Sequence, residues 1–155
     1  MKTKSCWTVF LLSLIAINAV LAAPLNSAQM RAMKTAYAQQ DKALLAKNAN
    51  GLIALTDISF QRKSAEGVRT GRELERAYIL DGFPHIKSFD SVRTTVKSSD
   101  FVGHKIVVVA QTRFSGVFRN TPQDKWTHRV FATTSRDIWV STPNGWKLRL
   151  TEEML

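Results

Sequence analysis

Three side chains on separate segments of the sequence have the chemistry for acid–base catalysis, namely Asp57, Tyr37 and His128. A carboxyl group inside an apolar pocket has a raised pKa and can act as a general base. His128 could pair with Asp57, one serving as the base and the other orienting it. However, Asp commonly starts strands or caps turns, and no second acid is paired with Asp57 in the sequence. We therefore expect a structural role for Asp57 and treat all three as weak catalytic candidates.

A second group of residues could bind a ligand. Tyr37 lies on the inner face of a predicted helix, where its hydroxyl either reaches a pocket or finds a backbone partner in the core. Gln111 and Arg113 share one face of a predicted strand, and an arginine there can grip a carboxylate or phosphate. If that face points outward, the two residues are solvated or form a dimer contact. The alternation of residues along the strand does not decide whether the face points into the pocket or outward. The ligand-binding candidates are Tyr37, Gln111, Arg113, Phe131 and Trp139.

The sequence indicates no metal site and no cofactor. His85, His104 and His128 lie on three different segments, and neither His-x-His nor His-x-x-x-His occurs. Cys6 is the only cysteine and lies near the N-terminus, so the rest of the chain has no thiol for catalysis or metal binding.

The first 22 residues are typical of a signal peptide. Lys2 and Lys4 precede an apolar run over residues 7–17, and Val20-Leu21-Ala22 provides a cleavage site, which predicts a mature chain of residues 23–155. The run is short for a membrane-spanning helix, so we expect cleavage, no stable membrane insertion, and a secreted or periplasmic product. An exported chain without disulfides must be held together by packing alone.

The chain is basic, with 22 Lys and Arg against 12 Asp and Glu. Removing Lys2 and Lys4 leaves a net charge of +8, which could attract a small anionic ligand. The charges are scattered, without a basic run or interleaved aromatic residues, so nucleic-acid binding is not expected.

The candidate residues must be positioned by a helical first half and a strand-rich second half. A helix over residues 28–49 should end at Gly51, and Thr70 with Glu73 forms a capping-box pattern that predicts a second long helix with Leu74, Ala77 and Tyr78 facing the core. Four strands follow, over residues 85–97, 104–118, 126–140 and 146–150. Asn144-Gly145 between the last two is a strong hairpin signal.

This order of elements resembles that of the nuclear transport factor 2-like superfamily over residues 28–150. The segments Glu66-Gly-Val-Arg-Thr-Gly-Arg-Glu-Leu74 and Asp137-Ile-Trp-Val-Ser-Thr-Pro-Asn-Gly-Trp-Lys-Leu148 look like the SnoaL-like and uncharacterised bacterial branches. The resemblance implies an α+β fold, a cone in which N-terminal helices pack on a curved antiparallel sheet and enclose a pocket. The length of the mature chain predicts a single domain over residues 23–155. By the resemblance, many members of the superfamily are dimers through the convex face of the sheet.

Two functional classes remain open. The first is an exported binding or interaction domain with a hydrophobic pocket for a small hydrophobic or anionic ligand. The second, implied by the resemblance, is a small isomerase, dehydratase or hydrolase using Asp57, Tyr37 or His128. The sequence lacks a recognisable catalytic constellation, which favours the first. Strands 104–118 and 126–140 carry apolar residues at both parities, which predicts a homodimer through the sheet.

Overall fold

The computed structural model describes residues 22–155. The predicted signal peptide, apart from its last residue, lies outside the described residues. The elements, in chain order, are β1 (Ala23–Pro24), α1 (Ser27–Leu45), α2 (Ala49–Ala54), β2 (Thr56–Lys63), β3 (Arg69–Gly71), α3 (Arg72–Gly82), a 3-10 turn η1 (Phe83–His85), β4 (Ile86–Val102), β5 (Lys105–Phe118), β6 (Thr127–Thr142) and β7 (Gly145–Met154).

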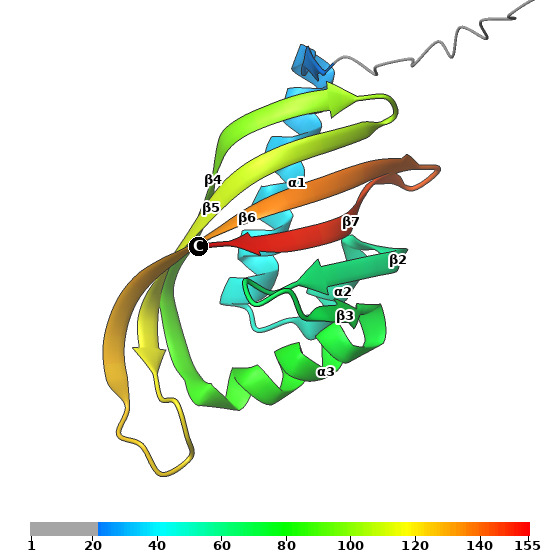
Figure 1. Cartoon of the computed structure of the whole chain (residues 1–155). Helices are drawn as coiled ribbons and strands as arrows, with labels where there is room; N and C mark the ends of the chain where they lie inside the picture. Colours follow the sequence, from blue (N-terminus) through cyan, green and yellow to red (C-terminus); the bar gives the residue numbers. More distant parts are fainter. Residues whose placement is uncertain (1–21) are drawn as a thin grey trace, which may run out of the picture.

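Within residues 22–155, all the strands belong to one sheet, which has seven strands in the order β1-β4-β5-β6-β7-β2-β3. The four long strands form the predicted antiparallel meander, while β2 joins its edge by pairing parallel to β7. Helix α1 runs across one face of the sheet, and α3 lies below it, opposite the strongly curled ends of β4, β5 and β6 (Figure 1). The predicted α+β fold of helices on a curved sheet is confirmed, with one parallel pairing in an otherwise antiparallel sheet.

Helix α1 is the main cover of the sheet. Its start is a capping box, in which the Asn26 side chain accepts from the Gln29 amide and the Gln29 side chain accepts from the Asn26 amide. The helix ends at Leu45, earlier than predicted. Lys47, with a φ of 48°, takes the left-handed position that was predicted for Gly51, and Gly51 lies inside α2.

The core lies between α1 and the centre of the sheet. Met33 and Tyr37 of α1 pack against alternate residues of β5 and β6, where Ile106, Val108 and Trp139 are fully buried. This alternation defines the inner face of the sheet, which faces α1, and the outer face, which no helix covers in Figure 1.

The curl of the sheet has an identifiable origin in β4. This strand has three register shifts against β5, and Lys87, Asp90 and Lys97 are the extra residues. Such bulges bend a strand and increase its local twist. At the curl, Gly116 of β5 approaches so closely that an added Cβ would lie 2.3 Å from the Ser88 carbonyl oxygen. The bend therefore needs both the bulges and this glycine.

Helix α3 differs from its prediction in two ways. Its N-cap is Gly71, which makes no side-chain cap, so the predicted capping box of Thr70 and Glu73 is not formed. Its inward face carries Glu75 and Ile79, whereas Leu74 and Tyr78 are exposed. The predicted core face of α3 is therefore wrong, because tertiary charge pairing decides the orientation of this helix.

Candidate functional site

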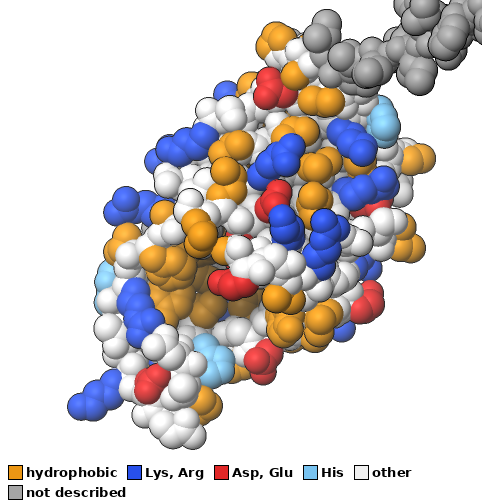
Figure 2. Space-filling model, viewed as in Figure 1, with side chains coloured by type: hydrophobic (Ala, Val, Ile, Leu, Met, Phe, Trp, Pro, Cys, Tyr) orange, Lys and Arg blue, Asp and Glu red, His pale blue; other side chains and the backbone are white. Residues whose placement is uncertain are grey.

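A hollow lies between α3 and the inner face of the curled half of the sheet. Figure 2 shows it as a depression with hydrophobic side chains on its floor. Its inner part is a cavity of about 190 Å³ bounded by both apolar and polar side chains. A wider groove, lined by residues that include Phe118 and Phe131, continues along the curl toward the β5–β6 end.

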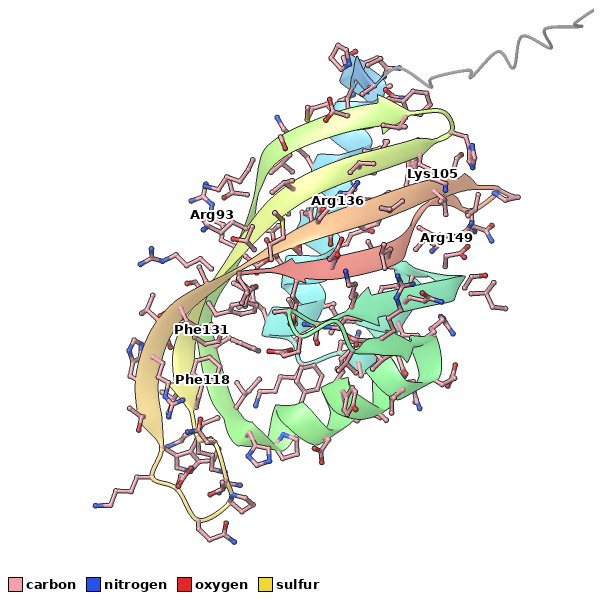
Figure 3. All side chains as sticks on the ribbon, viewed as in Figure 1. Arg93, Lys105, Phe118, Phe131, Arg136 and Arg149 are labelled. Carbon is pink, nitrogen blue, oxygen red and sulfur yellow. The ribbon has the colours of Figure 1, made fainter. Side chains whose placement is uncertain are left out.

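Phenylalanine side chains form one wall of the hollow. Phe114 and Phe131 stack with ring centroids 5.0 Å apart, and Phe118 meets Phe131 edge-on at 5.4 Å. Phe89 of β4 completes the cluster against Phe114 and Phe118. In Figure 3, Phe118 and Phe131 point from the curled strands toward the side of α3. Phe131 is 43% exposed, so the wall presents aromatic surface to whatever enters the hollow.

The opposite end of the cavity is polar. Arg62 of β2 donates through one terminal nitrogen to Glu75 of α3 at 2.9 Å, and through the other to Glu153 of β7. All three residues line the cavity, and Glu75 is 7% exposed. Hydroxyl-bearing residues of the sheet surround them, namely Thr112, Thr133, Thr134, Ser135 and Thr151. The cavity therefore has an aromatic end and a charged, hydroxyl-rich end.

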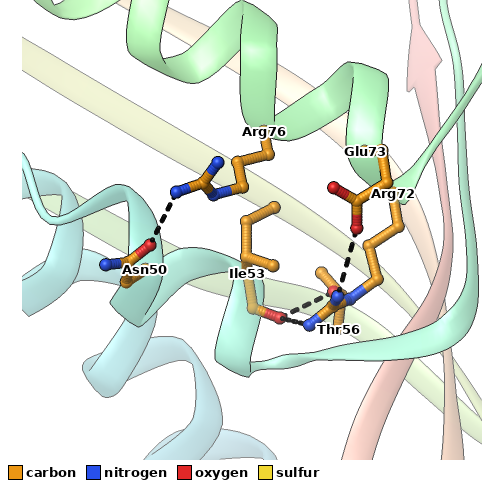
Figure 4. Close-up of polar contacts among 6 residues, drawn as sticks. All are labelled: Asn50, Ile53, Thr56, Arg72, Glu73 and Arg76. Atoms are coloured by element: carbon orange, nitrogen blue, oxygen red, sulfur yellow. Dashed lines mark hydrogen bonds and ion pairs between the residues drawn. The ribbon is translucent and has the colours of Figure 1, made fainter.

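Helix α3 is held over the hollow by polar contacts. Figure 4 shows Arg72 donating to the Thr56 hydroxyl at 2.9 Å and to the Ile53 carbonyl at 3.2 Å. One turn later, Arg76 donates to the Asn50 side chain at 3.4 Å. These contacts fix the helix to the junction of α2 and β2, and so set the width of the hollow.

Below the cavity, Tyr37 belongs to a buried hydrogen-bond network. Its hydroxyl donates to Asp137 Oδ2 at 2.7 Å and accepts from Trp139 Nε1 at 3.2 Å. Burial raises the pKa of Asp137. Burial, with the adjacent Asp137 carboxyl, also raises the pKa of Tyr37. Tyr37, Asp137 and Trp139 are each at most 4% exposed, so the network lies in the core rather than at the cavity surface.

The other two catalytic candidates lie elsewhere and have other partners. Asp57 accepts from the Ser59 amide at 3.0 Å and from Arg149 at 3.1 Å. The Ser59 amide, followed by the Arg149 guanidinium, lowers the pKa of Asp57 despite its burial, so this carboxyl is held ionised. His128 is exposed on the curled strands, where its Nε2 lies 2.7 Å from Asp90. The expected structural role of Asp57, at the start of β2, agrees with these contacts.

The structure shows on which face of the sheet the remaining ligand-binding candidates lie. Thr112 and Phe114 face the cavity, so the alternating residues Gln111 and Arg113 are on the outer face. Arg113 is exposed there and lies directly across from Arg93 in the β4–β5 ladder. Arg93, Lys105, Arg136 and Arg149 mark this basic face in Figure 3. Of the five ligand-binding candidates, Phe131 is thus the one in the hollow, while Tyr37 and Trp139 are in the core.

The residues that shape the polar end were not singled out from the sequence. Arg62, Glu75 and Glu153 come from three elements, and their separations of 13 and 91 positions leave no local pattern. Asp137 could have been found, because it alternates with Trp139 on β6 and must share its inward face.

Two further findings concern the described residues only. Over residues 22–155, no group of three or more His, Cys, Asp or Glu side chains could hold a metal ion. In the same range, no helix has the length and apolar character needed to span a membrane.

Comparison with known proteins identifies the fold. No model of a known protein family and no curated protein sequence matches the chain. A nuclear transport factor 2-like protein of unknown function from Shewanella oneidensis has a TM-score of 0.62 at 10% identity, covering 81% of this chain and 98% of that one. A nuclear transport factor 2-like protein from Cytophaga hutchinsonii gives 0.62 at 13% identity, with coverages of 84% and 98%.

A third similar structure has a proposed activity in its name. This protein from Streptomyces avermitilis, a proposed dehydratase of the same family, has a TM-score of 0.65 at 10% identity and covers 83% of this chain and 97% of that one. At these identities the similarity defines the fold alone. The chain has the nuclear transport factor 2-like fold, which confirms the resemblance predicted from its sequence.

Proposed function

We propose that this nuclear transport factor 2-like domain is an exported small-molecule-binding domain with a hydrophobic pocket. The observation that carries the proposal is the hollow between α3 and the curled sheet, where Phe114 and Phe131, backed by buried Phe118, present aromatic surface beside a small polar end. Concave, mostly apolar sites with a few polar groups are the usual form of small-molecule sites. Export is supported by the N-terminal sequence, with its positive start and short apolar run.

The alternative is a small pocket enzyme, in keeping with the name of the Streptomyces avermitilis protein. Catalysis needs an acid or base within reach of a bound substrate. Asp57 is ion-paired to Arg149, exposed His128 is within hydrogen-bond distance of Asp90, and the Tyr37 hydroxyl is bonded to Asp137 in the core. These pairings favour binding over catalysis.

The test is to identify what the protein retains. Mass spectrometry of small molecules released from protein purified from its native compartment should show an apolar compound at near-stoichiometric amounts. Phe131→Ser should lose it, because the serine removes half of the stacked Phe114–Phe131 pair. Ile58→Ser is the matched control, since Ile58 is 88% exposed and lies outside the hollow. Equal retention by both variants would contradict the proposal.

We also propose a homodimer through the outer face of the sheet. Val107, Ile138 and Leu150 lie side by side across β5, β6 and β7 on this face, and each is only half-buried within one chain. A second copy would bury this apolar row. Sedimentation equilibrium over a dilution series measures the mass. A single species of about 15 kDa at micromolar concentration, the mass expected for one mature chain, would contradict the dimer.

A further inference from the structure

We propose that the pocket selects a ligand whose polar end is a primary amine, carried on a small aromatic body, and discriminates against the corresponding carboxylate. This inference rests on the proposed binding function and specifies the chemistry of its ligand. The basic character of the whole chain would instead favour an anionic ligand. The charged side chains that line the cavity favour a cationic one.

The charge balance of the cavity is the reverse of that of the whole chain. Lys and Arg outnumber Asp and Glu by 22 to 12 overall. Within the cavity, two carboxylates, Glu75 and Glu153, face one guanidinium, Arg62. The lining thus has a net charge of −1, and a cation or hydrogen-bond donor suits it better than an anion.

Arg62, the only cationic side chain among the described residues that line the cavity, already forms ion pairs with acidic residues of the lining. Both terminal nitrogens of Arg62 are bonded, one to Glu75 and the other to Glu153. A carboxylate ligand would have to displace one of these acids and leave it beside the new anion, close to Glu75, whose side chain is 10% exposed. Only Glu75 is close to buried, and removing the partner of such a carboxylate is unfavourable. An ammonium group can instead add to the acceptors of Glu75 and Glu153 without breaking either pair.

The size and wall of the cavity define the ligand body. A volume of about 190 Å³ accepts a single ring with a short arm rather than a large polycyclic molecule. Phe114 lines this cavity and stacks on Phe131, so an aromatic ring entering from the groove can extend the stack. A two-carbon arm then carries the amine toward the polar end.

Three matched probes test the inference by isothermal titration calorimetry on the purified chain of residues 23–155: 2-phenylethylamine, 2-phenylethanol and 3-phenylpropionate. They share the phenyl body and differ at the polar end in being cationic, neutral and anionic at pH 7. We expect the amine to bind about ten-fold more tightly than the alcohol and the carboxylate to bind most weakly. Competition between amine and alcohol would show that both use one site.

Two variants assign the selectivity to the acidic residues. Glu153→Gln and Glu75→Gln should each lower the affinity for the amine about ten-fold and leave the affinity for the alcohol within about two-fold. Glu73→Gln is the control, because Glu73 lies on the same helix with its side chain 84% exposed. Thermal midpoints identify any variant that fails to fold, and Glu153, the more exposed of the two, then carries the test.

The outcomes separate this inference from the proposed function. If 3-phenylpropionate binds as tightly as the amine, or if neither acidic variant changes the preference, the selectivity is overturned while the binding function stands. If none of the three probes binds, the inference about the ligand is overturned, and the retention test with Phe131→Ser and Ile58→Ser then decides the proposed function separately.

Discussion

Replacing Tyr37 by Phe should cost about 3 kcal/mol of unfolding free energy, because the hydroxyl links two groups that have no access to water. It donates to Asp137 at 2.7 Å and accepts from the Trp139 indole at 3.2 Å. Trp139 is 0% and Asp137 3% exposed, so neither partner can recover a bond from solvent. Leaving one buried polar group unpaired costs about 1–3 kcal/mol, and this substitution affects two.

Urea unfolding followed by circular dichroism measures this cost, and a thermal scan should show a midpoint lowered by about 10 °C. Tyr78→Phe is the control, since Tyr78 is 56% exposed on α3, and its variant should stay within about 0.5 kcal/mol of the wild type. If Tyr37→Phe also stayed within that margin, with an unchanged m-value, the reasoning that places this hydroxyl in a buried network would be refuted.

Three further predictions follow from the sequence and the fold. Gly116→Ala should lower the free energy of unfolding by about 3 kcal/mol or abolish folding, because the added Cβ would lie 2.3 Å from the Ser88 carbonyl oxygen. Gly82→Ala is the control. It has open space around it and should leave the free energy of unfolding unchanged in the same urea titration. Burial raises the pKa of Asp137, so its contribution to stability is present below the ordinary carboxyl pKa and is lost as pH rises through the folded-state value. As pH rises above the ordinary carboxyl pKa, the stability of Asp137→Asn should increase relative to the wild type by up to about 1.4 kcal/mol per pH unit. A constant difference in urea unfolding would argue against a raised pKa of Asp137. N-terminal sequencing of protein from the extracytoplasmic fraction should begin at Ala23, and a chain that still starts at Met1 there would exclude the predicted cleavage.

Much of the fold could be predicted because its signals are local. The long strands alternate, and the predicted hairpin between the last two strands forms. Its turn residues are Pro143 and Asn144 rather than Asn144 and Gly145, and Gly145, with a φ of 91°, pairs with Thr142. Tyr37 faces inward because helical periodicity fixes its side of α1. In each case the deciding residues lie within a few positions of one another.

The candidate site could not be predicted because its determinants are distant in sequence. Apolar spacing placed Leu74 and Tyr78 in the core, yet Glu75 faces inward because Arg62 of β2 receives it there. The Tyr37–Asp137 contact joins residues 100 positions apart. Which face of β5 carries Gln111 depends on the register across several strands, which no single strand encodes.

The three extra residues of β4 affect the shape of the hollow without changing which side chains line it. Lys87, Asp90 and Lys97 are exposed, and each lies between two residues that keep their own partners on β5. Deleting one would leave those pairs and their faces intact while straightening the strand. The depth of the hollow and the chemistry of its wall can therefore be changed separately. A single-residue deletion in β4 would change the depth, and a substitution in the wall would change what the hollow recognises.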